Sequence, residues 1–152
     1  MRMNKKQNNP AGFDLDLFLP YLLNQAAEVT SRSFQKIYRV EYGMTRTQWR
    51  VMANLGKHGS MTAVEICRRT FIEKTKISRA VQALQEKGFL TRAAIIGDRR
   101  AERLSLTSEG SAVCLALGKR AAAFDLNLRN HLGREAADAL VKVLRTLMEA
   151  SN

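Results

Sequence analysis

Basic and hydrogen-bonding side chains gather in one stretch of the sequence. Residues 65–103 contain ten Lys and Arg residues against five Asp and Glu residues, a surplus of five positive charges. Guanidinium, ammonium, hydroxyl and amide groups can bond to phosphates and to the base edges in a DNA groove. The candidates for such contacts form two groups, Lys74, Thr75, Lys76, Ser78, Arg79 and Gln82, and then Asp98, Arg99 and Arg100. Because the Asp98 carboxylate would repel phosphate, we expect it to orient Arg79, Arg100 or a loop amide.

The spacing around these candidates predicts a winged helix-turn-helix. Two capping boxes, Thr45 with Gln48 and Thr62 with Glu65, predict helix starts. We expect helices over 46–57, 63–69 and 73–87. The last has its apolar residues at helical spacing, namely Ile77, Ala80, Val81 and Leu84. Strands at 89–96 and 103–107 then enclose a polar loop at 97–102. In this arrangement helix 73–87 enters a major groove and the hairpin reaches nearby phosphates or the minor groove.

The flanking regions predict helices that need a partner. Helices are expected over 20–42, 108–130 and 134–149, each with an apolar stripe. The winged core requires few of these apolar residues, so a second copy of the chain is their simplest cover. The short apolar stretch 15–19 fits the same role. The expected fold class is mainly α with a small β-hairpin. Within one integrated domain it comprises a disordered basic tail (1–12), an N-terminal dimerisation helix (13–44), the winged DNA-binding lobe (45–107) and C-terminal dimerisation helices (108–152).

Composition narrows the class of function. The 152 residues carry a formal net charge of +11, which favours a polyanionic partner. No apolar run is long enough to span a membrane, no secretory signal is evident, and two cysteines suit a reducing cytoplasm. His58 and His131 lie far apart without further ligands, so no metal site is expected. No nucleophile–base pair, paired carboxylates or Gly-rich phosphate loop predicts an enzyme, and no cofactor is expected.

Two segments resemble the MarR family of bacterial transcriptional regulators. They are Lys76–Leu90 and Asp98–Gly110, and Gln48–Val51 is also similar to the family's second helix. The Asp98-Arg99-Arg100 tip and the Leu106-Thr107-x-x-Gly110 exit resemble the SlyA branch. The resemblance spans about residues 17–149. It implies a homodimer on a pseudo-palindromic operator, with Arg79 in the major groove, Asp98 bracing the wing and Arg100 in the minor groove.

The resemblance also implies a pocket for small phenolic or carboxylic effectors, between the dimerisation helices and the winged lobe. Candidate lining residues are Tyr21, Asn24, Arg32, Tyr38 and Trp49, with Arg120 as an anion partner. A tryptophan in this position is more often a core residue, and an arginine such as Arg32 is more often a solvated cation. Family members that sense hydroperoxides carry a cysteine near the start of the first helix, and this sequence has none there. Cys114 falls on an apolar stripe and is expected to be a small core residue. Cys67 adjoins Arg68 and Arg69, which would lower its pKa, but burial is the better explanation for it.

The sequence therefore predicts a ligand-responsive, DNA-binding transcriptional regulator that acts as a homodimer. We expect a repressor, with activation as an open possibility, since the outcome depends on where the operator lies. The alternative is a basic nucleic-acid-binding or packaging protein without sequence preference.

Overall fold

The computed structural model describes residues 12–150. The expected basic tail (1–12) lies outside the described part except for its last residue, Gly12, and residues 151–152 also lie outside it. In chain order the elements are η1 (Leu15–Leu17), α1 (Leu19–Tyr42), α2 (Arg46–His58), α3 (Ala63–Thr70), α4 (Lys74–Glu86), β1 (Leu90–Ile95), β2 (Asp98–Leu106), α5 (Ser108–Leu132) and α6 (Arg134–Glu149). The fold is mainly helical with one two-stranded antiparallel hairpin, which confirms the expected fold class.

Local side-chain caps set the starts of the lobe's helices. At α2, the Thr45 hydroxyl accepts from the Gln48 amide and the Gln48 side chain accepts from the Thr45 amide, each at 3.2 Å. Thr62 and Glu65 repeat this pattern at α3, with distances of 3.2 and 2.7 Å. Both predicted capping boxes are therefore confirmed. Each box satisfies amides that a helix start otherwise leaves without an acceptor.

The hairpin differs from its prediction. Its strands pair from Leu90 opposite Leu106 to Ala94 opposite Glu102, and then the register shifts so that Ile95 lies opposite Asp98. The expected polar loop over 97–102 is wrong, because β2 already begins at Asp98. The two residues that join the strands are Ile96 and Gly97, and Gly97 adopts a φ of 90° that favours glycine. The segment 99–101 falls in the register shift, a bulge that polarity alone does not reveal.

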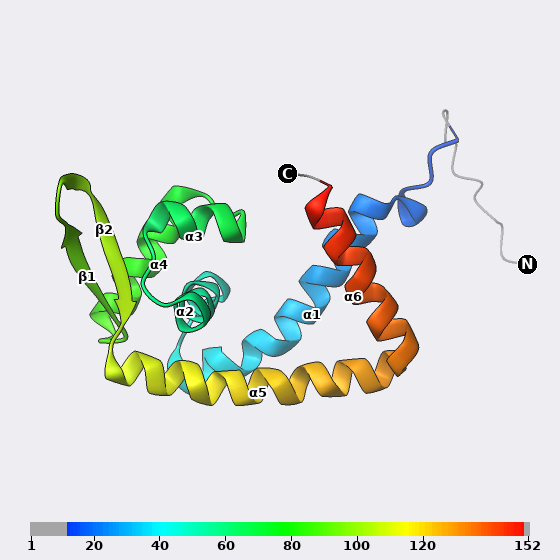
Figure 1. Ribbon diagram of the computed structural model, residues 1–152. Coiled ribbons are helices and arrows are strands. Elements are labelled where there is room, and N and C mark those ends of the chain that lie inside the picture. Colours follow the sequence, from blue (N-terminus) through cyan, green and yellow to red (C-terminus); the bar gives the residue numbers. More distant parts are fainter. Residues whose placement is uncertain (1–11, 151–152) are drawn as a thin grey trace, which may run out of the picture.

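Residues 45–107 form what we call the winged lobe, at the left of Figure 1. Helix α2 lies at its centre and packs against α3, α4, β2 and α5. Met61 and Leu104 exchange backbone hydrogen bonds of 3.0 and 2.8 Å, which ties the loop before α3 to the wing. The core of the lobe is fully enclosed, with Val51, Ile66 and Ile77 each 0% exposed. The predicted inward stripe of α4 is buried throughout.

Residues 12–44 and 108–150 form what we call the helical body. Helix α5 runs along the lower edge of Figure 1, from the base of the wing to α6, and α1 crosses between them. Helix α1 buries only Phe34 and Tyr38, and α6 buries only Ala137. Within the described chain, η1 buries no residue at all. The body therefore leaves much of its apolar surface exposed.

The lobe and the body approach each other closely at two glycines. A Cβ added at Gly110, in the first turn of α5, would lie 2.0 Å from the Phe89 carbonyl oxygen. A Cβ at Gly56 would lie 2.5 Å from the sulfur of Cys114. Thr107 caps α5 by accepting from the Gly110 amide at 2.9 Å. These contacts fix the direction in which α5 leaves the wing.

Candidate nucleic-acid interface and adjoining pockets

The outer face of α4 is basic and open to solvent. Once the stripe of Ile77, Ala80, Val81 and Leu84 is buried, the other face carries the predicted contact residues. All six are exposed: Lys74, Thr75, Lys76, Ser78, Arg79 and Gln82. The N-cap residue Glu73 makes no side-chain hydrogen bond to the first turn. The first amides of α4 can therefore bond to an external acceptor.

The wing carries the second group of cations: its strand β1 packs against α4, and the hairpin then extends away from the helices (Figure 1). Asp98 turns its carboxylate back on its own strand, where it accepts from the Arg100 amide at 2.9 Å. This is one of the roles expected for it, and it fixes the backbone at the bulge. Arg99 and Arg100 are exposed. Arg103, in contrast, donates to the Ser60 carbonyl at 3.1 Å and lies 3.8 Å from Glu65, so it ties the wing to α3.

The charges on this face are not neutralised from within. Among the ion pairs of the described residues, none involves the cations of the α4 face or of the wing tip, which are Lys74, Lys76, Arg79, Arg99 and Arg100. Exposed cations without partners raise the local potential and attract a polyanion. The structure thus brings the two predicted groups together in one lobe.

An aromatic pocket of about 480 Å³ lies between α1, α2 and α5. Trp49 stacks on Tyr38 with ring centroids 5.9 Å apart, and Phe34 contacts both Trp49 and Phe124. Two arginines of α2, Arg46 and Arg50, also line this pocket. A pocket with aromatic walls and a few charged groups suits a small aromatic ligand with a polar end.

The two arginines differ in their partners. Arg46 makes two hydrogen bonds to one carboxylate oxygen of Glu28, at 2.7 and 3.0 Å. Arg50 donates to the Thr70 carbonyl at 3.0 Å, which is a neutral acceptor. Burial and the nearby Arg46 lower the pKa of Arg50. Burial also raises the pKa of Tyr38, although both arginines oppose that shift. Among the described residues Arg50 forms no ion pair, because Asp125, which also lines the pocket, pairs with Arg129 instead.

The predicted effector residues do not all meet here. Tyr38 and Trp49 line the aromatic pocket, and Asn24 lines an adjoining one of about 410 Å³ that shares Arg46 and Arg50. Tyr21, Arg32 and Arg120 line neither of these two pockets. Arg32 pairs with Glu28 at 2.7 Å with its side chain 72% exposed, and Arg120 pairs with Glu41.

Sequence reasoning missed Arg46, Arg50 and Phe34 as pocket residues. The sequence did contain a signal: Arg46 and Arg50 are four residues apart on one helix, where like charges repel each other unless another group compensates them. The packing of α2 against α1 supplies that reason, since Glu28 comes within reach of Arg46. That packing is not visible in the pattern of one helix.

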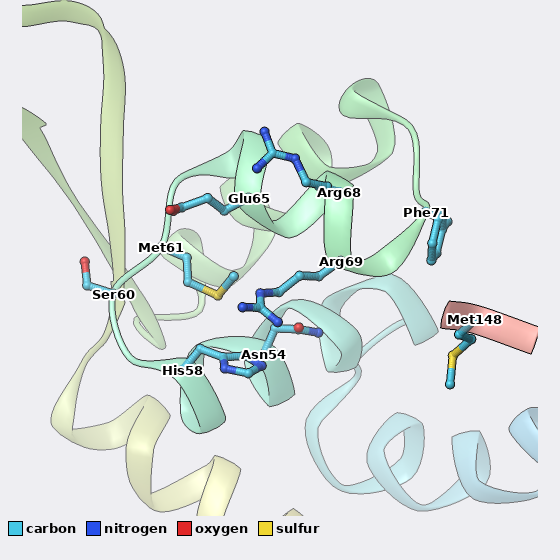
Figure 2. A pocket seen from close by; sticks show the side chains of 9 residues that line it. All are labelled: Asn54, His58, Ser60, Met61, Glu65, Arg68, Arg69, Phe71 and Met148. Carbon is cyan, nitrogen blue, oxygen red and sulfur yellow. The ribbon is translucent and has the colours of Figure 1, made fainter. Parts of the chain in front are cut away.

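A third pocket, of about 630 Å³, lies between α2, α3 and the end of α6, and Figure 2 shows its nine lining side chains. In that view Arg69 extends across toward His58 and Asn54, while Met148 approaches from α6. Burial and the charges of Arg69 and Lys57 lower the pKa of His58. The pocket separates the lobe from the body, and its lining is mostly polar and exposed. Its walls offer less apolar contact than those of the aromatic pocket.

The two cysteines are half-buried thiols. Cys114 packs against the lobe core and its sulfur donates to the Met52 carbonyl at 3.6 Å. Burial raises the pKa of Cys114, as expected for a small core residue. Cys67 also packs against this core.

No helix in residues 12–150 combines the length and apolarity needed to cross a membrane.

Comparison with known proteins gives matches over both the lobe and the whole fold. Residues 42–101 match the family model described as MarR family. The HTH-type transcriptional repressor MdtR of Bacillus subtilis (strain 168) is 32% identical over 97 residues, which cover 64% of this chain and 59% of MdtR. The crystal structure of the MarR family transcriptional regulator SPO1453 from Silicibacter pomeroyi DSS-3 has a TM-score of 0.81 at 28% identity, covering 92% of this chain and 99% of that one. NadR in complex with 4-hydroxyphenylacetate has a TM-score of 0.74 at 22% identity, with 97% of each chain covered.

Proposed function

Because the chain belongs to the MarR family of transcriptional regulators, we propose that it binds a DNA operator through the winged lobe. Helix α4 lies in the major groove and reads base edges with Arg79, Ser78 and Gln82. The wing extends Arg99 and Arg100 to flanking phosphates or into the minor groove. The observation that carries the proposal is the set of exposed cations on α4 and the wing that form no ion pair with any carboxylate of residues 12–150.

The operator-binding species is a homodimer formed by the helical body. The side chains of Leu17, Leu19 and Val143 are 73%, 67% and 55% exposed, which is unfavourable for apolar groups gathered on one region. A second copy covers them through a two-fold interface. Two copies of α4 then enter successive major grooves about 34–36 Å apart, which requires a pseudo-palindromic operator.

The dimer acts as a repressor when its operator overlaps a promoter. A bound dimer there excludes the polymerase. The similarity to MdtR, which is named a repressor, favours this outcome over activation. The position of the operator relative to the promoter decides between the two.

The effector is a small aromatic acid that occupies the pocket lined by Trp49 and Tyr38. Within residues 12–150 the Arg50 guanidinium donates to the neutral Thr70 carbonyl and pairs with no carboxylate, so an effector carboxylate is a better partner for it. The similarity in fold to NadR, whose structure contains 4-hydroxyphenylacetate, supports this class of ligand.

Arg50 also gives the pocket a route to the DNA-binding face. The carbonyl to which it donates belongs to Thr70, the last residue of α3. Phe71 follows in the left-handed region at φ 55°, and α4 begins three residues later. A carboxylate that binds Arg50 competes with this carbonyl and frees the turn before α4. Small changes there shift the recognition helices relative to the operator.

Selection of bound duplexes from random DNA, with wild-type protein, tests the DNA-binding role. A specific regulator prefers its selected duplex over bulk DNA by at least roughly 10³-fold, while a packaging protein shows no such ratio. Arg79→Ala should abolish binding to that duplex, whereas the dimer persists in sedimentation. Arg39→Ala, an exposed cation of α1, is the matched control and should leave operator affinity unchanged.

Calorimetry with 4-hydroxyphenylacetate tests the effector role. Arg50→Ala should weaken binding by roughly tenfold or more, because a charged hydrogen bond is lost. Arg39→Ala removes an exposed cation of α1 that lines neither pocket and forms no ion pair within the described residues, and it should have no effect. Equal losses in both variants would reject Arg50 as the carboxylate partner.

A further inference from the structure

The outermost residue of the wing is apolar. Ile96 stands at the turn between β1 and β2 with its side chain 102% exposed. Single exposed apolar residues are common on protein surfaces and need no explanation by themselves. Here, however, the residue occupies the tip of a hairpin that projects away from the helices (Figure 1). The two arginines of the bulge follow it closely in the chain.

The backbone around Ile96 is held in a defined shape. Gly97, at φ 90°, makes the tight turn, and the Asp98 carboxylate accepts from the Arg100 amide at 2.9 Å. Further down the hairpin, Arg92 pairs with Glu102 at 3.3 Å across the strands. The tip therefore presents one apolar side chain beside exposed Arg99 and Arg100 in a fixed arrangement.

This combination matches the chemistry of a minor groove rich in A·T pairs. The groove walls are deoxyribose carbons, and the floor of an A·T pair exposes only acceptors. An apolar side chain displaces water from the acceptors of either pair, but a G·C pair adds the guanine 2-amino group, a further donor to desolvate that also protrudes from the floor and blocks close approach. Narrow A·T grooves also attract arginine, and other DNA-binding proteins place Ile or Leu side chains in the minor groove.

We propose that Ile96 is a specificity-determining residue, which enters the minor groove beside the half-site read by α4 and selects A·T pairs by excluding the guanine 2-amino group. Arg99 and Arg100 supply affinity for the backbone and the groove, whereas Ile96 supplies the discrimination. The inference rests on the proposed DNA-binding function, and it assigns to Ile96 the recognition of base pairs that α4 does not reach.

The test uses the selected operator with three versions of the base pairs that footprinting places under the wing: A·T, G·C and inosine·C. Inosine keeps the major-groove face of guanine but lacks the 2-amino group. Wild-type protein should bind the A·T and inosine·C duplexes alike and the G·C duplex about tenfold more weakly. Ile96→Ser should reduce this ratio to about twofold or less. Because Ile96 is fully exposed, the variant should melt at the wild-type temperature.

The matched control is Val40→Ser, which removes an 85% exposed β-branched side chain from α1 and should keep the tenfold ratio. A ratio in Ile96→Ser that equals the wild-type ratio would assign the discrimination to the arginines and overturn the proposal. So would an inosine·C duplex that binds as weakly as G·C. Selection that enriches no duplex overturns the DNA-binding function itself, whereas an enriched operator without A·T preference beside the half-site overturns only the role of Ile96.

Discussion

The winged lobe and the helical body use the same kind of apolar stripe to different ends. In the lobe, Ile66, Ile77 and Leu84 are each 0% exposed within a single chain. In the body, Leu140 and Val143 of α6 remain 44% and 55% exposed, although their spacing is equally regular. An apolar stripe thus predicts that a face is buried, but it does not say whether the chain itself or another copy buries it. The lobe has its own core, whereas the body leaves its stripe exposed, and the proposed homodimer is what would bury it.

The largest effect is expected when charged residues replace apolar ones on the exposed stripe of the body and the lobe is left unchanged. Leu140→Glu with Val143→Glu should raise the dimer dissociation constant by at least about a thousandfold. Each apolar side chain contributes about 1.5–3 kcal/mol when buried, and a two-fold interface counts every change twice. Sedimentation velocity should show single chains, and operator binding should fall with the dimer.

The control for this variant changes the charge of α6 by the same two units on its polar face. Lys142→Gln with Arg145→Gln should leave the dimer intact, since both side chains are exposed and form no ion pair within the described residues. If the Leu140 and Val143 variant stays dimeric, this face of α6 is not the dimer interface. The conclusion that a second copy buries the apolar stripe of the body would then be rejected.

The next effect is expected where the two regions join. Gly110→Ala should lower the free energy of unfolding by about 3 kcal/mol, because its Cβ would overlap the Phe89 carbonyl oxygen and the backbone must shift. The same change at Gly118, on the same helix with nothing within 4 Å of its Cβ, should stabilise the protein by up to about 1 kcal/mol. Denaturant unfolding measures both. Similar values for the two variants would show that α5 does not depend on the close approach to the wing.

Much of the fold could be predicted because its signals are local. Thr45 with Gln48, Thr62 with Glu65 and Thr107 each cap a helix through hydrogen bonds within four residues. The start of β2 could not, since Asp98 joins the strand through a register shift against Ile95 that depends on the partner strand. Polar composition predicted a loop at a place where a bulged strand forms.

The candidate site divides in the same way. The exposed face of α4 follows directly from the buried stripe on the same helix, so Arg79 and its neighbours could be identified from spacing alone. The aromatic pocket takes residues from three helices, and Arg46 and Arg50 belong to it because of how α2 lies against α1 and α5. Spacing within one helix carries no information about such crossings. The residues that only tertiary packing brings together were the ones missed.

A smaller change separates the function of the lobe from the stability of the body. Arg100→Ala should weaken operator binding by about tenfold and reduce the slope of log affinity against log salt by about one. The side chain is exposed and forms no ion pair within the described residues, so melting and dimerisation should stay at wild-type values. Arg134→Ala removes an exposed cation from the body and should leave the salt slope unchanged. An unaltered slope in Arg100→Ala would mean that this residue contacts no phosphate.

The smallest effect lies within the lobe, where two capping boxes differ in one respect. Helix α2 closes its box with the neutral Gln48, and α3 closes its box with the ionisable Glu65. Hydrogen bonds from the Thr62 amide and hydroxyl, followed by the charges of Arg103 and Arg68, hold the pKa of Glu65 below its ordinary value. A carboxyl whose pKa is lower in the folded state adds stability above the pKa of the unfolded chain. That stability is lost as the pH falls below about 4.3, the ordinary pKa of a glutamate, and then through the lower pKa of Glu65 in the folded state.

Glu65→Gln turns the second box into a copy of the first and so isolates this titration. At neutral pH the variant should melt slightly below the wild type, because a charged cap at a helix start is lost. As the pH falls below about 4, the two melting curves should converge, since protonation removes the same charge from the wild type. Hydrogen exchange should show the acid loosening first at the amides of α3, with those of α2 unaffected. A difference in melting temperature that stays constant down to acid pH would mean that Glu65 acts through its shape and hydrogen bonds rather than its charge, and that the two boxes are equivalent.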